Sequence, residues 1–381
     1  MDLFDLDPQG MDSWPARMAW SFREARILQV AVRMGLFSAL HERAKSHSRL
    51  ATELGADPDM TERLLVALAA LNLVIHDRGL WRNCLAATMY LVRDQPLYLG
   101  HVIEMASNWW EVYHDLEQLI REGRHGDRYQ FWRQKRLGRD EVYLKAMHAL
   151  ALAGQAQRLA RHASVLGGRR TLLDVGGAPG TYSVALCQRF ATLRVTLLDQ
   201  AESLSQTEQV IHEFGMEERI TLKEADWARE RLGNDEYEAL MLNHSMVGSE
   251  AQGLVQLMRA YEALKAGGVL VVQSFLLDND LNGSPGAALF NLLDNAFTLE
   301  QMRALLAEAG FERITLLFRS ELGQDILTAY KPLSSPTDTE NELVAYMSPE
   351  QEIFAMMRSG EDDSDALTVQ RGMRERLVQS N

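Results

Sequence analysis

The stretch LLDVGGAPGTYSVALC, residues 172–187, decides how the chain is interpreted. It begins with an apolar run typical of a buried strand, turns through glycines and a proline, and ends in an amphipathic segment typical of a helix. Gly176, Gly177 and Gly180 permit unusual backbone angles and close approach of a ligand. Ligands of open α/β sheets bind beside such a turn. Taken alone, the stretch is weak evidence, because a tight turn that binds no ligand has the same pattern.

The pattern after Thr171 predicts an α/β domain. Apolar strands alternate with amphipathic helices, which is typical of a mostly parallel sheet covered by helices. The expected strands are TLLDVGG (171–177), RVTLLDQ (194–200), RITLKEAD (219–226), YEALMLNH (237–244), GGVLVVQSFLL (267–277) and RITLLF (313–318).

The region before residue 100 is predicted to be helical. Residues 48–74 are interpreted as a helix, a turn and a longer helix that begins near Met60, and residues 74–83 as a two-stranded hairpin. This order is that of a winged helix, a module that often binds DNA. The second helix begins with acidic residues that would repel phosphates, which favours packing or dimerisation. These acids are Asp57, Asp59 and Glu62.

Composition excludes several classes of function. The formal net charge of -14 and the pI near 5.2 argue against a nucleic-acid partner, which requires concentrated lysine and arginine. Cys84 and Cys187 lie in different regions, and the acidic N-terminal residues lack an apolar signal core, so we expect a cytoplasmic protein without disulfides. No apolar run reaches about 18 residues, so no membrane helix is expected.

Two acids at strand ends strengthen the case for a nucleoside ligand. Asp199 ends the strand after the glycine turn, where a carboxylate can accept hydrogen bonds from ribose hydroxyls. Asp226 ends the next strand and precedes Trp227, a pair suited to an adenine amine and ring. Either acid alone could be a strand-end cap or a solvated charge. The turn lacks G-x-G-x-x-G spacing, which argues against a dinucleotide.

These motifs carry a resemblance. From about residue 20 to 330 the chain resembles class I S-adenosylmethionine-dependent O-methyltransferases of the small-molecule type, related to the caffeate, hydroxyindole and polyketide enzymes. DVGGAPG (174–180) is similar to the family's glycine motif, and Asp199 to its ribose acid. Ala225 and Asp226 are similar to its "GD" motif. Two further matching segments are YEALKAGGVLVV (261–272) and TLEQMRALLAEAGF (298–311).

The resemblance implies four regions. A winged-helix-like dimerisation domain is expected over residues 1–104, and long aromatic-rich helices over 105–165 as a linker that contributes to the substrate pocket. A Rossmann-like S-adenosylmethionine-binding methyltransferase domain follows over 166–332, and an acidic extension over 333–381. The family also implies homodimers in which the N-terminal helices help to close the partner's active site.

The resemblance and the strand-end pattern together define the expected site. S-adenosylmethionine is the expected cofactor, S-adenosylhomocysteine its product, and no metal is expected, because zinc and calcium motifs are missing. The predicted substrate pocket contains Met147, His148 and Met246. The predicted cofactor site comprises Asp174, Gly176, Gly177, Gly180, Asp199, Asp226, Trp227 and Asn243.

The expected catalytic base is missing from its place. Aligned without gaps, the family's histidine falls on Val247, whereas His244 occupies a position where the family usually has asparagine. His244 is our candidate catalytic residue. Three interpretations stay open: a displaced base, a cofactor-holding residue, or a strand-end histidine satisfied by the backbone.

The main hypothesis is a methyltransferase that O-methylates a small, aromatic, hydroxylated metabolite and has neither nucleic-acid nor membrane partners. A second hypothesis keeps the cofactor as a structural ligand for a decarboxylase or hydroxylase, because the usual histidine is absent. A third is a winged-helix regulator that senses a ligand.

Overall fold

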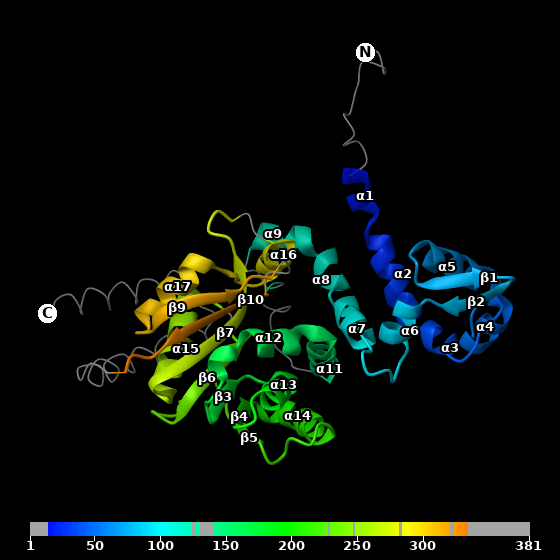
Figure 1. Cartoon of the computed structure of the whole chain (residues 1–381). Helices are drawn as coiled ribbons and strands as arrows, with labels where there is room; N and C mark the ends of the chain where they lie inside the picture. Colours follow the sequence, from blue (N-terminus) through cyan, green and yellow to red (C-terminus); the bar gives the residue numbers. More distant parts are fainter. Residues whose placement is uncertain are drawn as a thin grey trace, which may run out of the picture. The chain divides into compact units, whose positions relative to one another are not determined.

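The computed structural model describes residues 14–123, 127, 129, 141–227, 229–246, 248–281, 284–320 and 324–333. These form two compact units (Figure 1). Unit 1 comprises the described parts of Met1–Arg121 and Asp140–Ala153, and unit 2 those of Glu122–Arg139 and Gly154–Asn381. The predicted linker region, 105–165, is therefore divided between the two units.

Unit 1 begins with short helices around one apolar core. Buried core residues include Phe37, Leu50, Leu65 and Trp81. The helices are α1 (Trp14–Trp20), α2 (Phe22–Arg33), α3 (Leu36–Ala39), α4 (His47–Leu54), α5 (Pro58–Ala70) and α6 (Leu85–Leu91).

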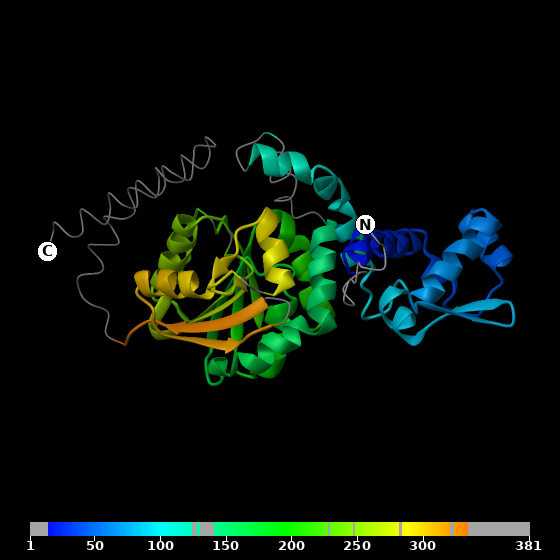
Figure 2. The ribbon, with the colours of Figure 1, turned by 90° about the horizontal axis from the view of Figure 1, so that it is seen from above.

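The predicted helix–turn–helix and hairpin are both present in unit 1. The Asp57 carboxylate caps α5 by accepting from the Met60 backbone N–H at 2.9 Å, and Pro58 is its first residue. Because proline needs no hydrogen-bond partner there, α5 begins at Pro58 and not near Met60 as predicted. Strands β1 (Val74–Asp77) and β2 (Leu80–Asn83) pair antiparallel, as predicted, and can be followed in Figure 2.

The aromatic-rich region after residue 100 is helical but broken into short segments, so the prediction of long helices is wrong. The backbone turns at Trp109 and again at Asp115. The chain enters unit 2 within a π-helical turn, where Gly154 has a φ of 119°. The segments are α7 (Gly100–Asn108), α8 (Trp110–His114), α9 (Leu116–Glu122), α11 (Glu141–Leu150) and the turn η2 (Ala151–Gln155).

Unit 2 is built on one mixed sheet with the order β5-β4-β3-β6-β7-β10-β9. The five neighbouring strands β5, β4, β3, β6 and β7 run parallel, whereas β10 pairs antiparallel with both β7 and β9. The short strand β8 pairs parallel with β7. The strands are β3 (Thr171–Val175), β4 (Arg194–Asp199), β5 (Ile220–Glu224), β6 (Tyr237–Asn243), β7 (Leu264–Leu277), β8 (Phe297–Thr298), β9 (Glu312–Phe318) and β10 (Gln324–Tyr330).

Helices cover both faces of this sheet (Figure 1). Leu159, Val184 and Val210 belong to the core cluster on one face, and Leu257 and Met302 to the cluster on the other. The first face carries α12 (Ala156–His162), α13 (Thr181–Arg189) and α14 (Ala201–Glu213). The second carries α15 (Glu250–Ala263) and α17 (Leu299–Glu308), while η3 (Ser164–Leu166) precedes β3 and α16 (Pro285–Leu293) follows β7.

All six predicted strands are present, and the mostly parallel, Rossmann-like sheet is confirmed. The sequence analysis missed β10, which begins with the polar residues Gln324 and Asp325 although both are buried. The strand order reverses between β3 and β6, because the chain leaves β3 toward β4 and later returns to its other side. This switch point is where an open α/β sheet binds its ligand.

Candidate functional site

The glycine turn lies between β3 and α13, as predicted, and needs its glycines for two separate reasons. Gly176 and Gly180 have φ values of 67° and 89°, a region that other residues rarely adopt. A Cβ on Gly177 would lie 2.5 Å from the Asp174 carboxylate. The turn is therefore packed against its own strand, and any side chain at residue 177 would displace the Asp174 carboxylate.

Asp174 is fully buried beneath this turn. The Ser183 hydroxyl donates a 2.5 Å hydrogen bond to Oδ2, while Oδ1 has no partner among the described residues. Burial raises the pKa of Asp174 to about 7, and the nearby Asp199 carboxylate acts in the same direction, whereas the Ser183 bond opposes both. Asp174 is thus partly protonated near neutral pH.

Asp199 ties the end of β4 to the glycine turn. Its Oδ2 accepts from the Ala178 backbone N–H at 3.0 Å, and its Oδ1 from the Gln200 backbone N–H at 2.8 Å. The side chain is completely buried. A carboxylate offers about four acceptor positions, so these backbone bonds are compatible with hydrogen bonds to ribose hydroxyls.

Asp226 and Trp227 follow β5 at the same edge of the sheet. The Asp226 side chain is partly exposed, and its Oδ2 lies 3.4 Å from Nη1 of Arg229. Trp227 packs against the core cluster of the second face. Both residues lie near the carboxyl end of β5, and their part in binding an adenine stays a prediction.

Asn243 ends β6 on the other side of the switch point. It shares a hydrogen bond with Tyr182, whose hydroxyl donates to Gln155 Oε1 at 2.9 Å. Burial raises the pKa of Tyr182, which keeps the hydroxyl protonated. Asn243 Oδ1 is buried without a partner among the described residues. An amide carbonyl in that state calls for a ligand, because an unpaired buried acceptor costs about 1–3 kcal/mol.

His244 adopts a left-handed backbone conformation with a φ of 53°. Asparagine and histidine tolerate this conformation better than most residues, which explains why either can stand here. Its backbone N–H donates to the Gln273 carbonyl at 2.8 Å, but both ring nitrogens are buried and unpaired among the described residues. The interpretation of a histidine satisfied by the backbone is therefore wrong for the ring.

Burial also determines the charge of His244. It lowers the pKa of the imidazole to about 4, because no carboxylate offsets the loss of hydration. The ring is consequently neutral at neutral pH. It can accept a hydrogen bond, but it is too weak a base to remove the proton of a phenol with a pKa near 10.

The sequence analysis missed four polar residues around these strand ends. Gln273 is 1% exposed, and both polar atoms of its side chain lack a partner among the described residues. The signal for it was one amide inside the apolar run GGVLVVQSFLL, residues 267–277. The other three residues are Gln155, Tyr182 and Ser245.

The predicted substrate pocket is not assembled by the described contacts. Met246 is buried in an apolar core cluster of unit 2. Met147 and His148 lie on α11 in unit 1, partly buried. Val247 lies outside the described residues, as does the extension after Leu333. The pocket role of Met147, His148 and Met246 stays a prediction.

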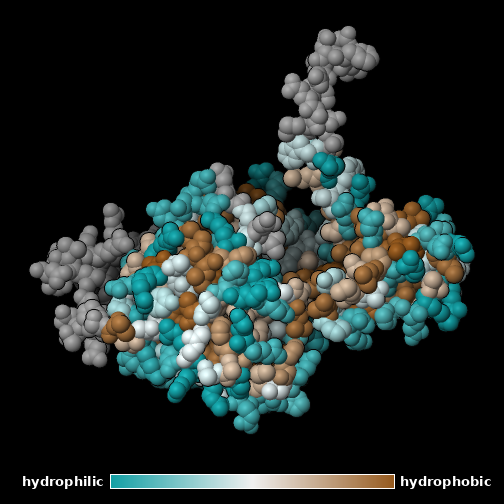
Figure 3. Space-filling model, in the orientation of Figure 1, coloured by the Kyte–Doolittle hydropathy of each residue, from teal (hydrophilic) through white to brown (hydrophobic). Residues whose placement is uncertain are grey.

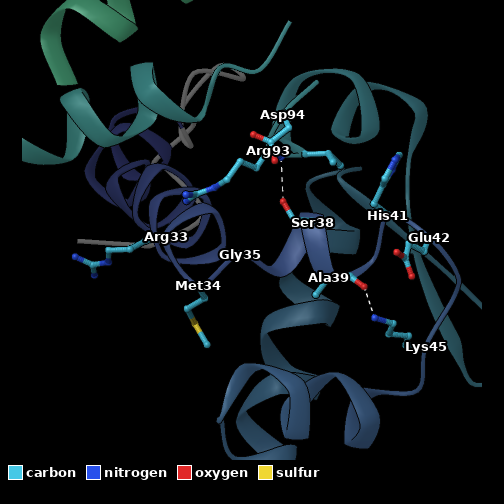
Figure 4. Close-up of a pocket in the computed structure, with 11 residues that line it drawn as sticks. Arg33, Met34, Gly35, Ser38, Ala39, His41, Glu42, Lys45, Arg93 and Asp94 are labelled. Carbon is cyan, nitrogen blue, oxygen red and sulfur yellow. Dashed lines mark hydrogen bonds between the residues drawn. The ribbon is translucent and has the colours of Figure 1, made fainter. Parts of the chain in front are cut away.

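A separate hollow of about 610 Å³ opens on unit 1 between α2, α3 and the segment after α6 (Figure 4). It contains none of the predicted site residues. The Ser38 hydroxyl accepts from the Arg93 backbone N–H at 3.0 Å, and the Ala39 carbonyl accepts from Lys45. These bonds hold α3 in place and make the hollow a structural feature of the helical unit.

The described residues contain neither a metal-binding cluster nor a membrane-spanning helix. Over 14–123, 141–227 and the later described ranges, no group of three or more His, Cys, Asp or Glu side chains could hold a metal ion. Among the helices that the structure describes, none is long and apolar enough to cross a membrane.

Comparison with known protein families shows which family the chain belongs to. Residues 16–93 match the model of an O-methyltransferase dimerisation domain, and residues 113–314 match that of an O-methyltransferase domain. The chain belongs to the S-adenosylmethionine-dependent O-methyltransferase family. This methyltransferase is accordingly an enzyme of small-molecule metabolism, with S-adenosylmethionine as its cofactor. The match to a dimerisation domain also replaces the interpretation as a DNA-binding regulator.

Curated relatives of the methyltransferase differ in the atom that they methylate. The chain is 28% identical to 3-hydroxy-5-methyl-1-naphthoate 3-O-methyltransferase of Streptomyces sahachiroi over 72% of its length and 80% of the relative's. It is 26% identical to the N,N-dimethyltransferase OxyT of Streptomyces rimosus over 83% and 95%. Human N-acetylserotonin methyltransferase, solved with S-adenosylmethionine, shares the fold with a TM-score of 0.75 and 20% identity over 86% and 100% of the two chains.

Proposed function

We propose that this methyltransferase acts as a homodimer and transfers the methyl group to oxygen of a small, aromatic, hydroxylated metabolite. The observation that carries the proposal is the strand, glycine turn and helix at the switch point, with Asp199 at the end of the adjacent strand. The O-methyltransferase family model and the naphthoate relative favour oxygen as the acceptor atom. A cytoplasmic location stays a prediction.

The residues at the switch point suit S-adenosylmethionine. The turn presents no side chain at Gly176, Gly177 or Gly180, and Asp174 Oδ1 and Asn243 Oδ1 are buried acceptors without partners among the described residues. Asp199 would accept from the ribose hydroxyls, and Asp226 with Trp227 would hold the adenine. When bound, the cofactor supplies an electrophilic sulfonium methyl group.

Methyl transfer is an in-line displacement, so the protein contributes mainly by positioning. The glycine turn is anchored to β4 through Asp199 before any ligand arrives, which reduces the loop ordering needed on binding. His244 would contact the acceptor as a neutral hydrogen-bond partner. Its buried, unprotonated nitrogen can orient a hydroxyl toward the methyl group without becoming charged.

The dimer is proposed from the dimerisation-domain match and from exposed apolar side chains on unit 1. Met60, Val66 and Leu80 are 62%, 57% and 44% exposed. Figure 3 shows hydrophobic residues on the side of unit 1 that faces the viewer. Light scattering coupled to gel filtration should give twice the chain mass of 43.0 kDa. A single-chain mass at all concentrations would exclude the homodimer.

Calorimetric titration with S-adenosylhomocysteine tests the cofactor site. Asp199→Ala should lower the affinity at least a hundredfold, about 3 kcal/mol, because it removes the ribose acceptor and releases the glycine turn. Glu224→Gln is the matched control, since Glu224 is the register partner of Asp199 on β5 and is exposed. Near-normal affinity in Asp199→Ala would contradict the assignment.

Product masses distinguish methyl transfer from the alternative in which the cofactor is only a structural ligand. Incubation with S-adenosylmethionine and a panel of phenols, aromatic amines and carbon acids should give a product heavier by one methylene, together with S-adenosylhomocysteine. Loss of carbon dioxide or gain of oxygen would support the decarboxylase or hydroxylase instead.

A further inference from the structure

Unpaired buried polar atoms gather at the carboxyl ends of β6 and β7. Asn243 Oδ1, both ring nitrogens of His244, Ser245 Oγ, and both Oε1 and Nε2 of Gln273 are buried without hydrogen-bond partners among the described residues. Asn243 and Gln273 are register partners on neighbouring strands, and the His244 backbone N–H bonds the Gln273 carbonyl. We call these four residues the strand-end polar cluster.

The cost of leaving these atoms unpaired indicates a ligand. Each unpaired buried polar group lowers the stability of the protein, and native proteins keep few of them. Unpaired buried atoms occur elsewhere too, as on Gln256 and on the neighbours Gln324 and Asp325, but half of those found among the described residues belong to the strand-end polar cluster. A ligand that supplies donors and acceptors would satisfy several of them together.

The position of Gln273 in the sheet indicates that the strand-end polar cluster contacts the methyl acceptor. Asp199 lies on β4, and the order β4-β3-β6-β7 places Gln273 three strands away, about 14 Å at the usual strand spacing. The sulfonium sulfur is bonded directly to the 5′ carbon of the ribose, so the reactive methyl stays near the ribose. A side chain beyond β6, such as Gln273, is therefore suited to contact the methyl acceptor, which lies on the side of the methyl group away from the sulfur.

Aromatic rings surround the same end of β7. Phe275, two residues after Gln273 and on the same face of the strand, stacks on Phe290 of α16 with ring centroids 4.5 Å apart. The His244 ring lies against Phe275 at 5.0 Å. Phe275 and Phe290 are partly exposed residues, so they offer apolar surface to an aromatic ligand.

The side chains of the strand-end polar cluster further restrict which methyl acceptors can bind. Its side chains are two amides, a hydroxyl and a neutral imidazole, none of which balances a charge. The Gln273 amide presents a donor and an acceptor side by side, which pairs with a ligand edge of the complementary kind. A carboxylate presents only acceptors and would be desolvated beside Gln273 without a cation.

Resting on the proposed function, we propose that Gln273 is a specificity-determining residue. Its amide binds a neutral aromatic methyl acceptor that carries a hydrogen-bond donor beside a hydrogen-bond acceptor on one edge. An aromatic carboxamide or an ortho-hydroxy ketone has this pattern. His244 and Ser245 complete the subsite, and Phe275 with Phe290 packs against the ring.

Binding of three matched probes to the complex with S-adenosylhomocysteine tests the proposal. The probes are 2-hydroxybenzamide, 2-hydroxybenzoate and 2-methylphenol. The wild-type protein should bind 2-hydroxybenzamide at least tenfold more tightly than either of the others. Gln273→Met, which removes the amide at similar length, should abolish this preference. Gln273→Glu should weaken 2-hydroxybenzamide at least tenfold.

Gln256→Glu provides the matched control, since Gln256 also carries a buried unpaired Oε1 but lies on α15, which packs on the other face of the sheet. It should leave the probe preference unchanged. Equal weakening of all three probes by Gln273→Met, or no binding of any probe by the wild type, would overturn the proposal. A tenfold loss of S-adenosylhomocysteine affinity in Gln273→Met would assign the amide to the cofactor instead. Failure of the wild type to bind S-adenosylhomocysteine would refute the proposed function itself.

Discussion

The two sides of the switch point differ in how their polar atoms are satisfied. On the β3–β4 side, Asp199 bonds two backbone N–H groups and Asp174 accepts from Ser183, so the glycine turn is held by the protein itself. On the β6–β7 side, the strand-end polar cluster keeps six buried atoms without partners among the described residues. One side is built before the ligand binds, and the other depends on the ligand to complete it.

Both sides share one electrostatic property. Burial raises the pKa of Asp174 to about 7 and lowers that of His244 to about 4, so each group is driven toward its neutral form. The consequences for stability have opposite signs, because one group is an acid and the other a base.

The largest effect is expected for Gly177→Ala on the preformed side. The new Cβ would meet the Asp174 carboxylate at 2.5 Å, so the turn must move and cofactor affinity should fall at least a hundredfold. Stability should drop by about 2 kcal/mol. Calorimetry with S-adenosylhomocysteine and urea unfolding measure the two effects.

Gly215→Ala is the control for this change. Gly215 has a φ of 62° but open space around its Cβ position, so alanine there should cost about 1 kcal/mol of stability and leave cofactor affinity unchanged. Equal affinity losses in the two variants would mean that the close packing of Gly177 has no special role.

A pH-dependent effect on stability is expected for Asp174→Asn. The raised pKa means that wild-type stability is lost as pH rises from the unfolded value near 3.8 through about 7, by at most about 1.4 kcal/mol per pH unit. The variant lacks this penalty, so its stability relative to wild type should increase between pH 4.5 and pH 8. Urea unfolding at both values measures the difference, and a pH-independent difference would contradict the raised pKa.

The smallest effect is expected for His244→Gln on the ligand-dependent side. A lowered histidine pKa gives stability that is complete above about 6.5 and lost as pH falls toward 4. The stability advantage of wild type over the variant should therefore shrink by about 1–2 kcal/mol between pH 8 and pH 5. Chemical unfolding at both pH values tests this, with Asn83→Ala, a buried change in unit 1 that adds no titratable group, as the unrelated comparison.

The preformed side was predictable from sequence because its signals are local. The glycine turn, Asp199 and Asp226 follow strands whose apolar runs are visible in the chain. The antiparallel strand β10 was missed, since its first residues are polar although the fold buries them.

The ligand-dependent side was harder to predict because it depends on register. Gln273 becomes the neighbour of Asn243 only when β6 and β7 pair, thirty residues apart in the chain. Its unpaired state follows from what surrounds it in space. The left-handed backbone of His244 and the breaks at Trp109 and Asp115 likewise have no local signature that the sequence analysis could use.

The hydrogen bond from the Ala178 N–H to Asp199 has a consequence for how such enzymes diversify. Because this bond fixes the turn to β4 independently of β7, mutations at the carboxyl end of β7 can accumulate while the cofactor stays bound. Acceptor preference is thereby free to drift within one scaffold, and a lineage can acquire new substrates without passing through ancestors that have lost their methyl donor.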